Sequence, residues 1–573
     1  MFFRQEKHSK LESMDNTTPS INPKSLNKLI ESSIRDNWEL TAFSDIGGIN
    51  LPFKDVAVYV AKLHILFQAA GLKPGDRVAL CGKNSSKWAV ALIACLTARM
   101  VAVPILHEFK SDMIHHLVNH SDSKLMFVDA AIWENLDERL LPELEGVFFI
   151  SELGMPFSRN KKLSEARSNI NELFGRKFPY DCTPDDILYM QDSPDDLALI
   201  NYTSGSTGAS KGVMLTFGNL WSNIRFCLDH LSFLKAGDGI VNMLPLAHLY
   251  GMTIDMLHPF CRGCHCHFLT RVPSPKVILG AFAEIRPKLV ITVPLILEKI
   301  IRTRVFPMLD KPLMRFLMKI PGIDTRLLEK VKDGLEQAFG GNLQELIIGG
   351  AALNGEIEAF LKKIGFPYTV GYGMTECGPL ITYAPHQTNR LRSCGQVVDR
   401  MEVKVDSPDP ANVPGDLWVR GENVMKGYYK NPKATAEVMP ESENGWMNTG
   451  DLCTMDHDGF ITICGRSKTM ILGPSGQNIY PEEIEQTLNN LPYVNESLII
   501  DDNGRLVALV HPDFDSARSQ GLDMESLDKI MADNLTALNH EMPQYSKISK
   551  IKILEEEFEK TPKHSIKRFL YQP

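Results

Sequence analysis

The sequence predicts an α/β protein with a large N-terminal domain of mainly parallel sheets flanked by helices, a β-rich subdomain, and a small mobile α+β C-terminal domain. Three observations predict this class. Short apolar runs alternate with helical patterns up to about residue 394, the pattern then changes to β-rich runs with turns, and a mixed unit follows residue 468. The chain has 573 residues, far more than the ~150 of a typical domain, so several lobes are expected.

The expected strands of the N-terminal domain are apolar runs of four to six residues. They are residues 77–80, 101–105, 124–128, 197–202, 289–293 and 345–348. The longest apolar stretch, residues 88–105, contains Arg99 and falls short of the ~20 apolar residues that cross a bilayer. It is therefore interpreted as a buried helix followed by a strand.

The later part of the chain predicts two further units. Residues 415–421 and 458–464 are short β-rich runs, and Pro481 stands at the first turn of a helix expected over 481–488. The predicted division is residues 1–394 for the N-terminal α/β core, 395–467 for the β-rich subdomain of the same domain, and 468–573 for the C-terminal domain.

Composition excludes several classes of protein. Hydrophobic residues make up 44% and charged residues 23%, within the ordinary globular range. The net charge of -9 lacks the basic excess that nucleic-acid binding needs, so no nucleic-acid partner is expected. The 11 cysteines are scattered, and the polar first 19 residues lack the apolar core of a signal peptide, which together predict a cytoplasmic location.

The strongest chemical signal is the segment Tyr-Thr-Ser-Gly-Ser-Thr-Gly-Ala-Ser-Lys-Gly at residues 202–212, between two apolar runs. It supplies hydroxyl donors, glycines that let the backbone approach an anion, and a cation. These residues are Thr203, Ser204, Gly205, Ser206, Thr207, Gly208, Lys211 and Gly212. The pattern predicts a phosphate-binding loop between two strands rather than a flexible linker. It differs from the P-loop because Ser210, not glycine, precedes the lysine.

This segment resembles the adenylate-forming (ANL) superfamily of acyl-CoA synthetases, luciferases and peptide-synthetase adenylation domains. Further motifs follow in the superfamily's order from residues 71–77 to Thr561 and Pro562. Residues 244–251 and 419–429 are most similar to long-chain fatty-acyl-CoA synthetases. The resemblance implies an AMP-forming acid-thiol ligase. Its expected cosubstrates are ATP and coenzyme A, and its expected cofactor is Mg²⁺.

The resemblance also implies roles for individual nucleotide-binding residues. By this resemblance, Tyr372, with Gly373 and Met374, stacks on one side of adenine, and Gly349, Gly350 and Ala351 form the wall on the other side. Thr375 contacts phosphate and Glu376 holds Mg²⁺. Asp451 accepts the ribose hydroxyls, and Arg466 is a second residue that contacts the nucleotide. A magnesium ion suits a single carboxylate because it usually bridges phosphates with few protein ligands. Lys468 matches the hinge about which the C-terminal domain turns between adenylation and thioester formation.

His248 and Gly251 are assigned to the acyl-binding site by the same resemblance. His248 lies in an apolar stretch, where a gating or core histidine is as well supported as a catalytic base. Peptide-synthetase domains carry an aspartate just beyond this point, whereas this chain has Leu249. A medium- or long-chain fatty acid, whose acyl chain carries no charge, is therefore expected.

Two segments carry competing interpretations. Residues 261–267, Cys-Arg-Gly-Cys-His-Cys-His, have the spacing of a haem-attachment or metal motif, but their apolar surroundings favour buried thiols in a strand. Residues 311–319 space three cations four apart and could contact a membrane surface peripherally. A helix packed on the domain with solvated cations is the favoured interpretation.

The C-terminal motif departs from the superfamily. Where relatives carry a catalytic lysine, this chain has Ser565, with Lys563 and Lys567 two residues to either side. We assign the missing charge to Lys563, so the expected catalytic residues are Lys211, Thr375, Glu376 and Lys563. Solvated lysines with no catalytic role are the alternative.

The sequence therefore predicts an enzyme that attacks the α-phosphorus of ATP with a fatty-acid carboxylate and then transfers the acyl group to coenzyme A. Transfer to an acyl carrier protein thiol would leave every nucleotide motif unchanged. A catalytically impaired acyl- or adenylate-binding protein is the alternative that Ser565 raises.

Overall fold

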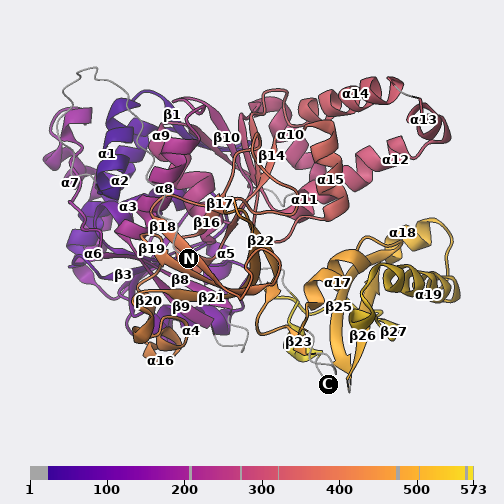
Figure 1. Cartoon of the computed structure of the whole chain (residues 1–573). Coiled ribbons are helices and arrows are strands. Elements are labelled where there is room, and N and C mark those ends of the chain that lie inside the picture. The colour runs from indigo at the N-terminus through magenta and orange to yellow at the C-terminus, as the bar shows by residue number, and fades with distance from the viewer. Residues whose placement is uncertain are drawn as a thin grey trace.

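The computed structural model describes residues 24–204, 210–270, 274–320, 322–472, 478–502, 504–561 and 566–571. Within these residues, a large N-terminal body joins a smaller C-terminal domain, which is yellow at the lower right of Figure 1. No helix of the described residues is both long enough and apolar enough to span a bilayer. The predicted fold class is confirmed by the solved structures that share this fold, described below.

An eight-stranded sheet forms the centre of the N-terminal body. Its order is β20 (Gly427–Tyr428), β9 (Ser210–Thr216), β8 (Leu197–Ser204), β4 (Val101–Ile105), β3 (Arg77–Cys81), β5 (Ser123–Val128), β6 (Gly146–Phe149) and β7 (Phe157–Ser158). Neighbouring strands from β8 to β6 are parallel, and those at the two ends pair antiparallel. Every residue of β4 is buried, as expected for a parallel strand covered on both faces.

Two smaller, mainly parallel sheets complete the α/β part. One has the order β10 (Gly239–Asn242), β11 (His265–Phe268), β1 (Thr41–Asp45) and β2 (Asn50–Pro52), and the other β12 (Leu289–Thr292), β13 (Glu345–Ile348) and β14 (Tyr368–Val370). Strand β12 ends at Thr292, one residue earlier than predicted, because Val293 caps the helix that Pro294 begins.

Helices from the first half of the chain cover these sheets. They are α1 (Leu26–Asp36), α2 (Phe53–Ala69), α3 (Ser86–Thr97), α4 (Ser111–His120), α5 (Ala130–Trp133), α6 (Lys161–Ser168), α7 (Ile170–Lys177), α8 (Phe217–His230), the π-helix η3 (Tyr250–Leu257) and α9 (His258–Arg262). Helix α3 is entirely buried, and the Ser85 side chain accepts the N–H of Trp88 at its start. The prediction of a buried helix and strand over residues 88–105 is confirmed.

The remaining helices of the N-terminal body include a projecting arm. They are α10 (Pro275–Ile285), α11 (Pro294–Ile300), the π-helix η4 (Ile301–Val305), α12 (Phe306–Leu309), α13 (Pro312–Leu317), α14 (Ile323–Ala338), α15 (Gly355–Ile364) and α16 (Pro432–Val438). Helices α12, α13 and the start of α14 extend away from the body, at the upper right of Figure 1. Helix α13 contains no buried residue. The favoured interpretation of residues 311–319 as a packed helix is therefore wrong.

Antiparallel strands follow the α/β part. The first sheet joins β15 (Tyr372–Gly373), β16 (Leu380–Tyr383) and β17 (Gln396–Val397), and the second joins β18 (Met401–Asp406), β19 (Gly415–Gly421), β21 (Met447–Met455) and β22 (Ile461–Arg466). The main hydrophobic core includes residues from Leu26 to Ile461, so this unit packs on the N-terminal body. That continuity supports the proposal of a β-rich subdomain within the N-terminal domain.

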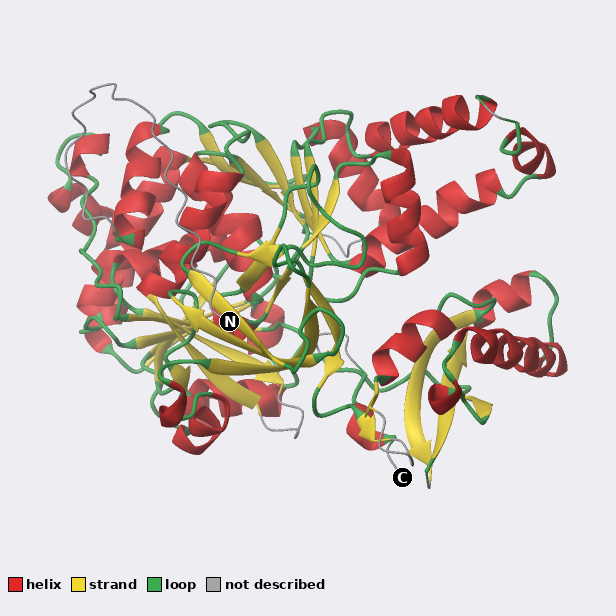
Figure 2. Cartoon of the chain, viewed as in Figure 1, coloured by secondary structure: helices red, strands yellow, loops and turns green. Residues whose placement is uncertain are grey.

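The C-terminal domain has hydrophobic clusters of its own. Its elements are β23 (Ile471–Leu472), β24 (Asn478–Ile479), α17 (Pro481–Leu488), β25 (Val494–Asp502), β26 (Arg505–Pro512), α18 (Phe514–Ser519), α19 (Met524–Glu541) and β27 (Lys550–Ile553). Figure 2 shows β25 and β26 as long strands beside the helices. The separate core supports a proposed domain boundary near Lys468.

Candidate functional site

The predicted phosphate loop connects two strands of the central sheet. Strands β8 and β9 pair antiparallel, with Thr203 opposite Lys211, so the two predicted strands are confirmed, while the predicted loop at residues 205–209 lies outside the described residues. Packing explains why residue 212 is glycine, because a Cβ there would lie 2.9 Å from the Ile200 side chain. Gly205, Ser206, Thr207 and Gly208 lie outside the described residues, as does the side chain of Ser204.

Lys211 and Glu376 meet through a tyrosine that the sequence analysis did not assign. The Nζ of Lys211 lies 4.8 Å from the centre of the Tyr428 ring. The Tyr428 hydroxyl donates to Glu376 Oε1 at 2.9 Å. The cation and the carboxylate, 165 positions apart in sequence by their numbers, are thus held at two sides of one buried ring.

A second group joins Tyr372, Asp451 and Arg466. Asp451 in β21 and Arg466 in β22 are opposite each other in the ladder, and their Oδ1 and Nε atoms lie 3.0 Å apart. The Tyr372 hydroxyl donates to Asp451 Oδ2. Asp451 is only 3% exposed, whereas its arginine partner is largely exposed. The structure therefore brings together three residues that the sequence assigned to the nucleoside.

Electrostatics couple the two groups. Burial raises the pKa of Asp451, although the guanidinium of Arg466 and the hydroxyl of Tyr372 act in the opposite direction. The charge of Asp451 is the main cause that raises the pKa of Arg466, and Glu376 adds to it. Burial, followed by the charge of Glu376, raises the pKa of Tyr428. The site therefore combines two carboxylates with an arginine and a lysine, a set able to bind a nucleotide and a cation together.

The segment from Tyr372 to Glu376 is fixed by a tight turn. Gly373 pairs with Leu380, and a Cβ on this glycine would lie 2.2 Å from the Pro379 carbonyl oxygen. The Met374 N–H donates to the same oxygen. Thr375 begins the 3₁₀ turn η5 (Thr375–Cys377) that carries Glu376. Only glycine fits at residue 373, so the motif's spacing has a structural cause.

The predicted adenine wall lies against the predicted acyl site. Gly349 follows β13, and a Cβ there would lie 3.1 Å from the ring of Tyr250. Gly350 has a φ of +86°, in the left-handed region that favours glycine, and both it and Ala351 are exposed. Tyr250 donates to the Ile347 carbonyl at 3.2 Å. Tyr250, which belongs to the motif at residues 244–251, therefore lies against the glycine motif at residues 349–351.

His248 lies two residues before the π-helix η3, and Gly251 is the second residue of that helix. The His248 N–H donates to the Pro245 carbonyl at 3.0 Å. A Cβ on Gly251 would lie 2.5 Å from the same carbonyl oxygen, so packing of the turn requires glycine. Leu249 is 2% exposed, which agrees with an apolar environment at this point.

The predicted hinge lies in an exposed turn between the two domains. Lys468 is exposed. The residues before and after it form hydrogen bonds to different domains. Ser467 donates to Asp416 of β19, while Thr469 donates to Glu482 of α17 at 2.7 Å. The domains also touch where Asn490 accepts from Arg302 at 3.0 Å and from Asn354. Rotation about residue 468 would have to break this second contact.

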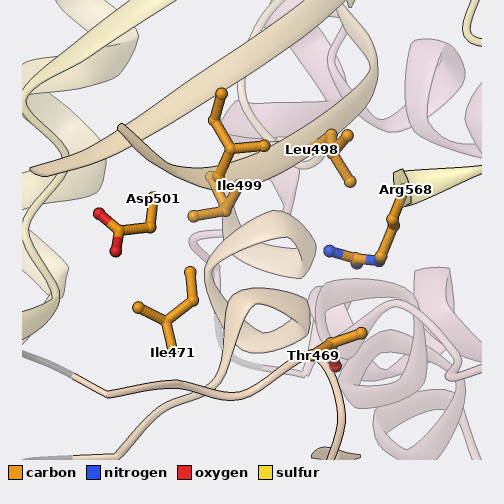
Figure 3. Close-up of a pocket in the computed structure, with 7 residues that line it drawn as sticks. Thr469, Ile471, Leu498, Ile499, Asp501 and Arg568 are labelled. Atoms are coloured by element: carbon orange, nitrogen blue, oxygen red, sulfur yellow. The ribbon is translucent and has the colours of Figure 1, made fainter. Parts of the chain in front are cut away.

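Around the C-terminal motif, the described residues begin again at Ile566. Lys563 and Ser565 lie outside them. Lys567 lies 3.0 Å from Glu559, so the alternative lysine already has an acidic partner. Arg568 contacts Glu485 and lines a cavity of about 210 Å³ beside the hinge segment (Figure 3). This cavity is lined by residues of the C-terminal segment alone and contains none of the predicted nucleotide residues.

The cysteine-rich segment is explained by packing. Cys264 and Cys266 are fully buried, and Cys266 lies in β11. Burial raises the pKa of Cys264 to about 12, which keeps the thiol protonated. Among the residues that the structure describes, no group of three or more His, Cys, Asp or Glu side chains is arranged to hold a metal ion. The prediction of buried thiols is confirmed for these two residues.

Comparisons with known proteins identify the family of the chain. The model of the AMP-binding enzyme family matches residues 31–429, and that of the AMP-binding enzyme C-terminal domain matches residues 468–571. The long-chain-fatty-acid–CoA ligase of Escherichia coli O6:H1 is 29% identical over 504 residues, which is 83% of each chain. The feruloyl-CoA synthase of an Amycolatopsis species is 28% identical over 465 residues, 79% of this chain and 81% of its own.

Among solved structures, ATP-bound MatB from Rhodopseudomonas palustris has the same fold, with a TM-score of 0.73 and 21% identity, over 96% of this chain and 98% of its own. The superfamily resemblance inferred from the motifs is confirmed. The chain belongs to the family of AMP-binding enzymes.

Proposed function

We propose that the chain is an AMP-forming acyl-CoA synthetase that activates a medium- or long-chain fatty acid with ATP and transfers the acyl group to coenzyme A. The observation that carries the proposal is the convergence of Lys211, Glu376, Tyr372, Asp451 and Arg466 from distant segments. The family assignment supports an ATP-dependent acid-thiol ligase. The long-chain ligase among the relatives supports the fatty-acid class.

The nucleoside half of ATP is assigned to the Asp451 group. A carboxylate has about four lone-pair positions; in Asp451, Oδ2 accepts from Tyr372 and Oδ1 is ion-paired with Arg466. The remaining positions suit the two hydroxyls of a ribose. Tyr372 lies with its ring beside this carboxylate and is our candidate for stacking on adenine, with Gly349, Gly350 and Ala351 on the other side.

The phosphates are assigned to Thr203, Lys211 and the loop between them. Glu376 accepts from the Tyr428 hydroxyl, and Thr375 precedes Glu376 in the 3₁₀ turn η5. A single carboxylate with a neighbouring hydroxyl fits Mg²⁺, which keeps several waters and binds phosphate oxygens for the rest of its shell. When bound, this ion would neutralise phosphate charge. The residues of the chain bind and orient the nucleotide, because the attacking carboxylate is already a nucleophile.

The acyl site is assigned to the turn at His248 and Gly251. Leu249 offers no charge to a substrate amine, which favours an uncharged acyl group. An aromatic acid is the second candidate, since the feruloyl-CoA synthase matches nearly as much of the chain. A carrier-protein thiol in place of coenzyme A would use the same nucleotide residues.

A panel of acids tests the substrate class. Saturated fatty acids of graded length and hydroxycinnamic acids are supplied singly with ATP, Mg²⁺ and coenzyme A, and thioesters are measured by mass spectrometry. The proposal expects the highest kcat/KM for fatty acids. If a hydroxycinnamic acid is turned over faster than every fatty acid, the proposed substrate class changes from fatty acids to aromatic acids. If product forms only with acyl carrier protein, the proposed acceptor changes from coenzyme A to that protein.

A further inference from the structure

The arm of the N-terminal body carries apolar side chains that the protein does not cover. Between the buried residues Val305 and Val331, none of the described residues is buried. Leu313 is 68% exposed and Phe316 is 62% exposed. Two largely exposed apolar side chains therefore lie three residues apart at the projecting end of the arm.

The arm is attached only at its base. Phe306 packs edge-on against Phe360 of α15, with ring centres 5.4 Å apart, and Val331 and Leu335 are the buried residues of α14. Helix α13 lies at the far end, as Figure 1 shows. The tip therefore projects from a rigid base and can reach a surface that the rest of the protein does not touch.

Cations flank the exposed apolar side chains. Lys311, Arg315 and Lys319 are all exposed, and Arg315 pairs with Asp310, itself 65% exposed. Within α13, a spacing of three places Leu313 and Phe316 on one side of the helix and Arg315 on another, while Lys311 caps the start of the helix and Lys319 follows its end. The arm from Lys299 to Ala338 carries nine basic and five acidic residues, although the whole chain has a net charge of -9. The arm is thus locally cationic in an acidic protein.

We infer that the tip of the arm docks on the surface of an anionic lipid bilayer; the tip is helix α13 with Leu313, Arg315 and Phe316, together with Lys311 and Lys319 at its two ends. A bilayer offers an apolar layer directly beneath anionic headgroups, which matches both features of the tip. A second protein chain fits less well. The two apolar side chains expose on the order of 250 Å² together, against roughly 800 Å² that each partner contributes to a stable protein interface.

The inference goes beyond the proposed function and does not depend on which acid is activated. Its consequence is peripheral contact alone, through a short segment inserted to the depth of two side chains. The electrostatic part should weaken with salt, because exposed charges are screened over ~10 Å at 0.1 M ionic strength.

Flotation with lipid vesicles tests the inference. The full chain is mixed with vesicles of phosphatidylcholine alone or with phosphatidylglycerol added. Wild type should float with the anionic vesicles and much less with the neutral ones. The variant Leu313→Ser/Phe316→Ser, which leaves the charge unchanged, should lower the partition coefficient by about tenfold or more. The variant Lys311→Gln/Arg315→Gln/Lys319→Gln should lose the preference for anionic lipid, by about fivefold per cation.

A matched control replaces exposed leucines outside the arm. Leu140 and Leu188 are 53% and 73% exposed, and Leu140→Ser/Leu188→Ser should float like wild type. Circular dichroism and ATP turnover check that each variant is folded. Failure of wild type to float, or equal flotation of the Leu313/Phe316 variant, would overturn the inference. A wild-type dimer in light scattering that this variant dissociates would assign the tip to a second copy of the chain instead.

Discussion

Asp451 is the residue on which the proposed nucleoside site depends most. It is buried, and its Oδ2 accepts a hydrogen bond from Tyr372 while its Oδ1 is ion-paired with Arg466. Its replacement by alanine should weaken AMP binding by ~1.5 to 3 kcal/mol, the usual contribution of hydrogen bonds to a charged group. Isothermal titration calorimetry with AMP measures the loss, which should be the same whatever acid is present.

Tyr372→Phe is the matched control, because it keeps the ring and removes only the hydroxyl that Asp451 accepts. It should weaken AMP binding less than the alanine variant does. Because burial raises the pKa of Asp451, the carboxylate should gain its proton at a pH above that of an ordinary aspartate. AMP affinity should therefore fall on acidification. A defect limited to one chain length would move Asp451 to the acyl site.

Glu376 is the single carboxylate assigned to Mg²⁺. Glu376→Gln keeps the shape and removes the charge, so adenylate formation at limiting Mg²⁺ should fall at least ~tenfold, and excess Mg²⁺ should partly restore it. Tyr428→Phe removes the hydrogen bond to Glu376 but keeps the carboxylate, and should retain nearly normal Mg²⁺ dependence. Rates are measured over a Mg²⁺ titration. Wild-type dependence in Glu376→Gln would rule out the metal assignment.

Most individual site residues could be proposed from sequence, but their contacts could not. Tyr428 lies within a segment that was compared with the family, yet nothing in the sequence indicates that its hydroxyl reaches Glu376, 52 positions earlier. Tyr250 was likewise part of a motif without a role. Such contacts depend on how distant strands are placed, which local patterns do not encode.

At the scale of elements, buried strands were the most predictable part of the fold. The bounds of β4 and β13 agree with the apolar runs that predicted them, those of β19 agree with the β-rich run at residues 415–421, and α17 begins at the expected proline. Strands β4 and β13 are buried along their whole length, whereas β19 alternates buried and half-buried residues and ends at glycines. The arm was mispredicted because an amphipathic pattern indicates an apolar face without indicating whether the protein covers it.

The turn at Lys468 is the element proposed to let the domains rotate. Lys468→Pro fixes φ, so it should slow thioester formation more than adenylate formation, since only the second half-reaction requires the rotation. Lys468→Ala removes the charge but keeps the freedom of φ, and should affect both steps little. The two half-reactions are timed separately by rapid quench. Equal losses in both steps of a folded proline variant would contradict the hinge.

At the scale of the whole molecule, the two domains must cooperate at one site. The proposed contribution of the C-terminal domain is Lys563, because Lys567 is paired with Glu559. Lys563→Ala should slow adenylate formation by ~10² to 10³, the usual cost of losing one preorganised donor. Transfer from preformed acyl-adenylate to coenzyme A should change little.

The matched control is Lys567→Ala, which breaks a surface ion pair and should leave the rate within a few-fold of wild type. The double variant checks whether one lysine replaces the other. A double variant that forms adenylate at the wild-type rate would show that no lysine of this segment is catalytic. The phosphate loop and Mg²⁺ would then have to supply the charge.

The central claim is that the chain converts a fatty acid and ATP into an acyl-adenylate with release of pyrophosphate. Exchange of labelled pyrophosphate into ATP measures this step directly, in the absence of coenzyme A. The account predicts exchange that depends on both fatty acid and Mg²⁺, and that is lost in Asp451→Ala and Glu376→Gln. If the chain binds AMP but no acid supports exchange, the chain is instead an acyl- or adenylate-binding protein without this activity.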